Sequence, residues 1–324
     1  MPLVDSPFHP PLWLREGHVQ TILGALWRQR FTSIFSRERW ELDDGDFLDL
    51  DWARRGGPRL AILSHGLEGS SEQGYIRGLA GALGAAGWDV LAWNFRGCSG
   101  EPNRLPRFYH SGETEDLRAI VGRAAGAYDR VALVGFSLGG NITLKYLGEA
   151  PPHPRVRGAA AISVPIELAS CARRLDRDRG NALYLRRFLG TMRTKIAAKA
   201  RQFPGSFDVS GLERVATFEE FDGRYTGPLH GFRDAEDYWA RSSARQFLPA
   251  LTVPTLLLNA RNDPFLTPAC FPESEAAASA QLFLEAPASG GHVGFLDLGP
   301  GPWWSRRVVG FLSGMDRTDA AAEE

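Results

Sequence analysis

The chain contains few cysteines, and their number and spacing exclude two kinds of site. Cys98, Cys171 and Cys270 are odd in number, lie far apart in the sequence and form no C-x-x-C pair. The sequence therefore offers neither a cysteine zinc site nor a disulfide framework. Because disulfides persist in oxidising compartments, this cysteine usage fits a reducing, cytoplasmic location.

The chain also lacks a large net charge of either sign and long apolar runs. The formal net charge is -1 over 324 residues, which gives no electrostatic reason for the surface as a whole to bind nucleic acid. No 18 apolar residues run together, and the prolines in MPLVDSPFHPPLWL interrupt the place where a signal peptide would be apolar. We expect a soluble protein that is still able to touch a membrane surface.

What the sequence does contain is an alternation of short apolar runs with helical segments. Such runs are typical of strands buried on both faces of a parallel sheet, and the alternation predicts an α/β fold with a doubly wound sheet. Upstream, RERWEL and DFLDLDWA alternate apolar and polar residues around DDGD, which predicts an antiparallel hairpin at about 37–53 as an edge of the sheet. The later strands are expected at 59–65, 88–95, 130–136, 156–163, 254–260 and 280–286, and the helices at 75–86, 114–127, 138–148 and 303–312.

The alternation breaks once, for roughly 80 residues that carry helical periodicity but no clear buried strand. We interpret this stretch as a helical cap inserted after a strand, above the carboxyl ends of the sheet, where open α/β folds bind ligands. The expected organisation is a core of residues 1–165 and 248–324, with an N-terminal arm over about 1–35, and a cap of residues 166–247. The final stretch, DRTDAAAEE, is polar and aperiodic and is expected to fray.

The stretch LVGFSLGGN places a serine between glycines, directly after an apolar run and directly before a helical one. Gly135-Phe136-Ser137-Leu138-Gly139 matches G-x-S-x-G in the strand-to-helix context of a nucleophile elbow. In such a turn the serine takes a strained backbone conformation, and the glycines remove side chains that would collide with the neighbouring strand and helix. An ordinary N-cap serine at a glycine-rich helix start is the alternative, and the surrounding order of strands favours the nucleophile.

A serine nucleophile needs a general base, and the base needs an orienting acid. Asp263 follows the run PTLLLNA and His292 follows the run AQLFLEA, so both are expected in loops at the carboxyl ends of strands. The chain order Ser137, Asp263, His292 is the order that accompanies this type of elbow. Asp-Pro after a strand is also a common turn opener, so other acids stay open for the orienting role: Asp234, Asp237 and Asp297.

The negative oxygen that forms when Ser137 attacks a carbonyl group needs two backbone N–H donors. Leu138, directly after the serine, is expected to supply one of them, and Leu67 in the stretch SHGLEGSS the other. We interpret His65 as structural, with a ring that orients this loop by hydrogen bonds. Four further residues are expected to shape the mouth of the pocket: Glu68, Gly69, Ser70 and Ser71.

Three other residues invite a catalytic interpretation, and the sequence favours a structural role for each. Cys98 in NFRGCSG is not followed by a helix, so it lacks the context of a nucleophile elbow. His110 stands in YHSGETEDL, an ordinary helix start with acidic residues in its first turn. His153 lies among prolines in APPHP and is expected in a surface loop.

Together these features resemble the α/β-hydrolase superfamily, and more narrowly its YheT-like branch, also called the AB hydrolase-4 family. The resemblance covers most of the chain and is carried by PPLWLREGHVQTIL, HGLEGSS, NFRGCSGEPN, YHSGETEDL, GFSLGGNITLKYLGE, NDPFL and GGHVGF. It implies a capped α/β-hydrolase fold, and it places Ser137, Asp263 and His292 at the triad positions of the family. Members are described as carboxylesterases, as lipases acting on medium-chain or phospholipid substrates, and as makers of ethyl esters.

One segment of the cap, residues 171–203, combines an apolar face with many arginines and lysines. The simplest interpretation is a solvated helix that packs its apolar face on the core. A sharper one is that this face roofs an acyl pocket, or that the basic face rests on an anionic membrane together with the basic stretch WRQRFTSIFSRER near the N-terminus. The apolar face consists of Leu185, Phe188, Leu189, Met192 and Ile196.

The expected function is hydrolysis of carboxylic esters with short to medium apolar acyl chains, with no metal or organic cofactor. Two alternatives use the same triad: transfer of the acyl group to an alcohol, and action on lysophospholipids or acylglycerols at a membrane. A non-catalytic binding protein is a third alternative, which the complete triad disfavours. The expected partner is a small apolar ester, and the oligomeric state stays open.

Overall fold

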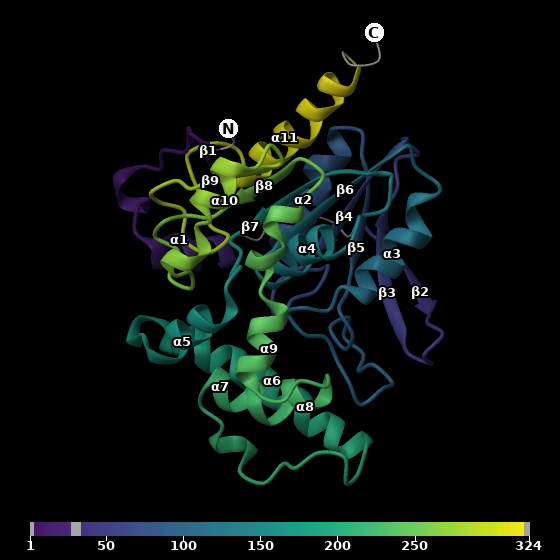
Figure 1. Cartoon of the computed structure of the whole chain (residues 1–324), viewed down its shortest axis with the longest axis vertical. Coiled ribbons are helices and arrows are strands. Elements are labelled where there is room, and N and C mark those ends of the chain that lie inside the picture. The colour runs from purple at the N-terminus through teal and green to yellow at the C-terminus, as the bar shows by residue number, and fades with distance from the viewer. Residues whose placement is uncertain (1–2, 27–33, 321–324) are drawn as a thin grey trace.

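The computed structural model describes residues 3–26 and 34–320, and a nine-stranded sheet forms its centre (Figure 1). The strand order is β1-β9-β8-β7-β6-β4-β5-β3-β2. β2 pairs antiparallel with β3 and β3 pairs antiparallel with β5, whereas the other neighbours are parallel. The strands are β1 (Leu3–Val4), β2 (Ser36–Glu41), β3 (Phe47–Ala53), β4 (Arg59–Ser64), β5 (Asp89–Trp93), β6 (Arg130–Phe136), β7 (Val156–Ile162), β8 (Thr255–Leu258) and β9 (Leu282–Glu285).

Helices flank this sheet and fill the segment between β7 and β8 (Figure 1). Those outside that segment are α1 (Gly17–Leu26), α2 (Gly74–Ala85), α3 (Glu115–Ala125), α4 (Leu138–Glu149), α10 (Glu273–Ala278) and α11 (Trp303–Ala320). Within the segment lie α5 (Leu168–Arg177), α6 (Ala182–Gln202), α7 (Phe218–Phe221), α8 (Gly227–Leu229) and α9 (Ala235–Ser242). Shorter turns are η1 (Leu12–Leu14), η2 (Arg179–Asn181), η3 (Leu212–Arg214), the π-helical η4 (Asp222–Thr226), η5 (Ala244–Ala250) and η6 (Pro268–Cys270).

The central strands are buried on both faces, as parallel strands in such folds are. In β4, Leu60 and Ile62 belong to one core layer and Ala61 and Leu63 to the other, because successive side chains of a strand point to opposite faces. α3 and α4 contribute apolar residues to the first layer, and α2 and α11 to the second. With both faces covered, the loops at the strand ends remain as the place for a site.

The predicted fold class is confirmed: the sheet is mostly parallel and doubly wound, with an antiparallel edge made by β2 and β3. All six predicted buried strands are present, and their ends differ from the predicted ones by no more than two residues. β1 was not predicted, because two residues carry no periodicity, yet it adds a parallel strand beside β9.

The end of the chain differs from the prediction. The last helix was expected to end at Leu312 and the following tail to fray, but α11 continues to Ala320. A helix that has already formed extends at little cost per residue, so α11 continues through this stretch without apolar periodicity in its sequence. The remaining residues of the tail, 321–324, lie outside the described part of the chain.

The segment between β7 and β8 lies at the end of the sheet opposite to α11 (Figure 1). Its buried residues, such as Leu189, Ile196, Phe221 and Trp239, belong to the same apolar cluster as one face of the sheet. This inserted part therefore shares the core instead of forming one of its own. We retain the division into a core of residues 1–165 and 248–324 and a cap of residues 166–247 as a proposal.

A close contact joins α4, the helix after the central strand β6, to η5, the last turn before β8. A Cβ atom added to Gly148 would lie 2.1 Å from the carbonyl oxygen of Phe247. The two backbones approach this closely only because Gly148 has no side chain. By contrast, a Cβ atom added to Gly122 in α3 would meet no atom within 4 Å.

We expect Gly148→Ala to lower the free energy of unfolding by about 1–3 kcal/mol, because the added methyl group forces α4 away from η5. The matched variant Gly122→Ala should raise the free energy of unfolding by about 0.5–1 kcal/mol, since alanine favours a helix more than glycine does. Chemical denaturation of the three proteins measures both effects. Equal stability of Gly148→Ala and the native protein would contradict the contact.

Candidate active site

Ser137 stands between the end of β6 and the start of α4, in a backbone conformation that residues other than glycine rarely adopt. Its φ and ψ are 51° and −119°, and such a conformation costs about 1–3 kcal/mol unless its surroundings hold it. The backbone N–H of Ser137 donates to the carbonyl oxygen of Ile162 at 2.9 Å. The geometry is that of the predicted elbow, in which the side chain stands clear of the sheet.

The glycines around Ser137 are required by close backbone contacts. A Cβ atom on Gly135 would lie 2.3 Å from the carbonyl oxygen of Gly139, and one on Gly139 would lie 2.4 Å from that of His65. A side chain at Gly135 would push β6 away from the start of α4, and one at Gly139 would push away the end of β4. The glycines therefore remove collisions with the neighbouring strand and helix, as the sequence predicted.

Asp263 and His292 lie in the loops after β8 and β9, as predicted, and the fold brings them together. Nδ1 of His292 and Oδ2 of Asp263 are 2.8 Å apart. The other oxygen, Oδ1, accepts the backbone N–H of Phe265 at 2.9 Å, and the side chain of Asp263 is fully buried. The carboxylate thereby holds one ring nitrogen of His292, which leaves Nε2 for a second partner. His292 and Ser137 line the same cavity.

The loop that carries His292 is held by residues that the sequence did not single out. The backbone N–H of His292 donates to Oγ1 of Thr21 at 2.8 Å, and that of Val293 donates to Oγ of Ser163 at 2.9 Å. Gln20 exchanges hydrogen bonds with the backbone of Leu296 on the same loop. Gln20 and Thr21 stand in the motif HVQTIL, so the stretch that carried the family resemblance near the N-terminus anchors this loop.

The two predicted donors to a negative oxygen, Leu67 and Leu138, line the same cavity as the serine. Leu138 begins α4, and the first N–H groups of a helix have no acceptor within it. Leu67 lies between two residues whose N–H groups are already bound: Gly66 donates to the hydroxyl of Tyr75 at 2.9 Å and Glu68 to that of Tyr109 at 2.8 Å. For the N–H of Leu67 itself, the described residues provide no acceptor.

His65 has the structural role that the sequence indicated. Its ring is fully buried, and burial lowers the pKa of His65 to about 3, so the ring is neutral. Nε2 accepts the backbone N–H of Phe95 at 3.2 Å, and Nδ1 donates to the carbonyl oxygen of Gly66 at 2.8 Å. Both ring nitrogens are therefore used to orient the loop before Leu67.

The other acids that the sequence left open have partners elsewhere. Asp297 pairs with Arg306, Asp234 caps α9 by accepting the N–H of Asp237, and Asp237 pairs with Arg233 and Arg241. Among the acids considered for the orienting role, Asp263 is the one that contacts His292 within the described residues.

The cysteines are arranged in a way that their spacing did not reveal. Cys171 and Cys270 are both buried, and their Sγ atoms lie 3.3 Å apart as free thiols. Burial raises the pKa of Cys98 to about 11, which leaves it a neutral thiol. This state agrees with the structural interpretation of Cys98.

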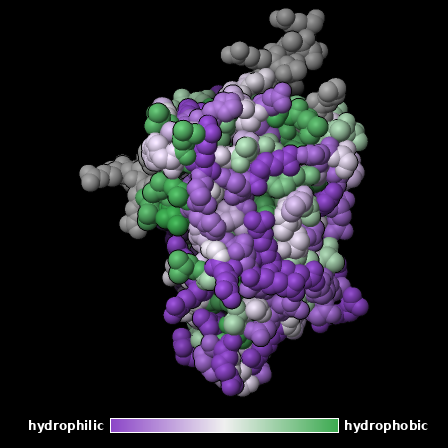
Figure 2. Space-filling view, turned by 90° about the vertical axis from the view of Figure 1, so that its left-hand side faces the viewer, coloured by the Kyte–Doolittle hydropathy of each residue, from purple (hydrophilic) through white to green (hydrophobic). Residues whose placement is uncertain are grey.

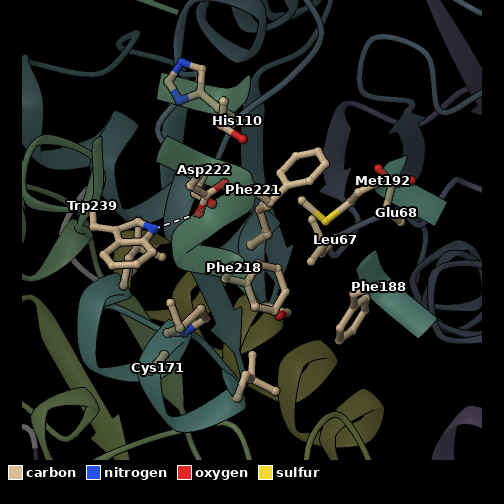
Figure 3. A pocket seen from close by; sticks show the side chains of 18 of the residues that line it. Leu67, Glu68, His110, Cys171, Phe188, Met192, Phe218, Phe221, Asp222 and Trp239 are labelled. Carbon is tan, nitrogen blue, oxygen red and sulfur yellow. Dashed lines mark hydrogen bonds between the residues drawn. The ribbon is translucent and has the colours of Figure 1, made fainter. Parts of the chain in front are cut away.

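A largely apolar cavity of about 910 Å³, including its opening, begins at Ser137 and extends under α6 and α7. Figure 3 shows Phe188 and Met192 of α6 and Phe218 and Phe221 of α7 around it. Two residues of the apolar face of α6, Phe188 and Met192, thus form part of the cavity wall, in line with the sharper interpretation of that face. A second cavity, of about 1360 Å³, shares Ser137, His292, Leu67 and Phe188 with the first and opens beside α1.

A carboxyl group that no pattern in the sequence indicated lies in the wall of the apolar cavity. Asp222 is buried and accepts the indole N–H of Trp239 at 2.8 Å (Figure 3). Burial raises the pKa of Asp222 to about 7, although hydrogen bonds from Thr226 and Trp239 oppose this shift and the carboxylate of Asp176 adds to it. η4, the π-helical turn that contains Asp222, is of a kind often found at functional sites.

The fold and this arrangement of serine, histidine and aspartate are those of the α/β-hydrolases. The family profile described as alpha/beta hydrolase fold matches residues 62–297, and the chain belongs to that family. The protein YheT of Escherichia coli, which is named as an esterase, is 35% identical over 321 residues that cover 95% of this chain and 94% of YheT. The chain therefore falls in the YheT-like branch, and it is a carboxylic ester hydrolase.

A more distant sequence relative and a solved structure of similar fold extend the comparison. The mouse protein named phospholipase ABHD3 is 27% identical over 308 residues, which cover 91% of this chain and 75% of ABHD3. The crystal structure of an esterase from Pyrococcus furiosus superimposes with a TM-score of 0.57 at 17% identity and covers 86% of this chain and 90% of the esterase.

We expect Asp222→Asn to change how stability depends on pH. The carboxyl group ionises near pH 3.8 in the unfolded chain and near pH 7 in the folded protein, where it is buried. Its contribution to the free energy of unfolding therefore falls as pH rises from about 4 through 7. Asparagine keeps the hydrogen bond from Trp239 and does not ionise. The variant should therefore gain stability relative to the native protein over this window, by at most about 4 kcal/mol.

Urea denaturation of both proteins between pH 4 and pH 8 measures this difference. Glu113, whose pKa is also raised to about 7 by burial, titrates in both proteins and cancels in the comparison. A stability difference that stays constant across the pH range would show that Asp222 is not the group that titrates.

Proposed function

We propose that the chain hydrolyses carboxylic esters with short to medium apolar acyl chains through Ser137, His292 and Asp263. His292 takes the proton from Ser137 as its hydroxyl attacks the ester carbonyl carbon, and Asp263 stabilises the imidazolium that forms. The N–H groups of Leu67 and Leu138 donate to the negative oxygen of the tetrahedral intermediate. His292 then gives the proton to the departing alcohol, and water cleaves the acyl-enzyme by the same steps.

The observation that carries this proposal is the strained Ser137 at the junction of the two cavities, next to the His292–Asp263 pair. We assign the apolar cavity under α6 and α7 to the acyl chain, since its wall is mostly aromatic and aliphatic. The second cavity, which opens beside α1, then takes the alcohol part of the ester. No cofactor enters this sequence of steps.

A lipase acting at a membrane surface is the second candidate, and one feature favours it. Large apolar side chains are exposed at the mouth of the second cavity. They are Ile22 and Leu26 of α1, which also line this cavity. Leu183, at the start of α6, is 78% exposed, and its neighbour Tyr184 stacks on His18 of α1. The face that carries α1 is otherwise largely hydrophilic (Figure 2).

The two basic surfaces that the sequence suggested for membrane contact are smaller in the structure. Lys195 and Lys199 of α6 turn inward, and within WRQRFTSIFSRER, Arg37 and Arg39 pair with Asp51 and Asp49. The residues 27–33 of that stretch lie outside the described part of the chain. Within the described ranges, no helix has the length and apolarity to cross a membrane. We propose peripheral contact through α1 and the start of α6 for the lipase candidate.

Hydrolysis of p-nitrophenyl esters from acetate to palmitate tests the proposed function. The native protein should turn over a limited range of chain lengths, and Ser137→Ala should lose on the order of 10^5-fold in kcat, because no other group replaces the nucleophile. Ser274→Ala, which changes an exposed serine in α10, serves as the matched control and should keep full activity. Equal rates for the native protein and Ser137→Ala would overturn the assignment.

Three further experiments separate the remaining candidates. Added ethanol that diverts the acyl group into ethyl esters faster than water hydrolyses it would indicate an acyltransferase. Activity that rises steeply on anionic vesicles carrying lysophospholipid or acylglycerol would indicate the lipase. A native protein whose Ser137 does not react with a fluorophosphonate would support the non-catalytic alternative.

A further inference from the structure

An ion pair joins the helix above the site to the loop that carries Leu67. Nζ of Lys195, in the middle of α6, lies 2.6 Å from Oε1 of Glu68, and the two side chains are only 15% and 11% exposed. We propose that Lys195 is a positioning residue: by holding Glu68 it fixes the backbone N–H of Leu67, so that the oxyanion hole is complete only while α6 is closed over Ser137. This inference rests on the proposed function and assigns a role to a residue that does not touch the substrate carbonyl.

Glu68 needs such support because its backbone is strained. Its φ is 53°, in the left-handed region that costs residues other than glycine about 1–3 kcal/mol. The turn is closed by a hydrogen bond from the N–H of Gly69 to the carbonyl oxygen of Gly66 at 3.0 Å. A change in φ at Glu68 would turn the peptide group that joins Leu67 to Glu68. The Cα atom of Leu67 would pass this movement to the preceding peptide group, which joins Gly66 to Leu67 and carries the N–H of Leu67.

The core alone supplies one partner for Glu68. The hydroxyl of Tyr109 accepts the backbone N–H of Glu68 and donates to its carboxylate, at 2.8 and 2.7 Å. Because the hydroxyl carries no charge, it cannot balance the negative charge of the carboxylate. Lys195 is the cation that does so, and it comes from α6 instead of the core.

The surroundings of Lys195 leave Glu68 as its counter-charge. Sγ of Cys98 lies 3.4 Å from Nζ, but that thiol is neutral because burial raises its pKa to about 11. Nζ also lies 4.7 Å from the centre of the Tyr109 ring, where it adds a cation–π contact. Lys199 lies one turn further along α6, and burial, together with the nearby charge of Lys195, lowers the pKa of Lys199 to about 8.

Lys199 provides a matched control within the same helix. It is buried and donates to the carbonyl oxygens of Asn103 and Leu105, so it also ties α6 to the core. Its contacts, however, are with a different loop, and it does not line either cavity at Ser137. A merely structural role for Lys195 predicts that the two lysines behave alike, whereas a positioning role predicts that they differ.

The test compares Lys195→Met and Lys199→Met by ester kinetics, thermal unfolding and inhibition with a trifluoromethyl ketone, which forms an oxyanion when Ser137 adds to it. Loss of a whole oxyanion-hole donor costs about 10²–10³-fold in kcat, and a displaced donor should cost less. For Lys195→Met we expect kcat to fall by about 10–100-fold at every chain length with KM nearly unchanged, and the affinity for the ketone to fall in parallel. Lys199→Met should lower the melting temperature but keep kcat.

Glu68→Gln keeps the test decisive if Lys195→Met folds poorly, because this change retains the shape of the side chain. Where both variants fold, the two changes also form a double-mutant cycle. Glu68→Gln alone should reproduce the loss in kcat, and adding Lys195→Met should lower kcat no further. Equal losses of kcat in Lys195→Met and Lys199→Met, or losses that multiply in the double variant, would overturn the inference.

If native Ser137 fails to react with a fluorophosphonate, the proposed function fails and the inference with it. If Ser137 reacts and Lys195→Met keeps kcat, only the inference fails.

Discussion

The site depends on one constraint, the left-handed backbone of Ser137 at the junction of β6 and α4. The strain is tolerated because glycines on both sides let the chain pack against its neighbours. The same close packing sets the rest of the site, since an added Cβ atom at Gly139 would strike the carbonyl oxygen of His65, at the start of the loop that leads to Leu67. The elbow that lifts the serine out of the sheet therefore also fixes the distance to the second N–H donor.

Around this elbow, hydrogen bonds connect loops that are remote in the sequence. Thr21 and Ser163 hold the backbone of the loop with His292, and the hydroxyls of Tyr75 and Tyr109 hold the backbone on either side of Leu67. Each of these side chains accepts a hydrogen bond from a backbone N–H. Each therefore orients a peptide group of the neighbouring loop. Precise placement of peptide groups is what catalysis by an oxyanion hole requires.

The inserted helices contribute both an apolar wall and charges. α6 presents Phe188 and Met192 to the cavity and Lys195 to the loop with Glu68, so one helix supplies both apolar wall and charge beside Ser137. Asp222 of η4 adds a carboxyl group to the same wall, with a pKa near 7. A movement of these helices would thus change the shape of the cavity and the electrostatics of the site together.

The sequence by itself determined the six buried strands, the hairpin, the elbow and the loops of Asp263 and His292, because strand periodicity and the order of motifs are properties of short segments. Only the tertiary structure decided which polar groups become buried partners. Lys195 and Lys199 looked like members of a solvated basic face but turn inward, and Cys171 and Cys270 meet although 99 residues separate them. Burial and pairing of these side chains depend on contacts between segments far apart in the chain, which no local pattern of residues records.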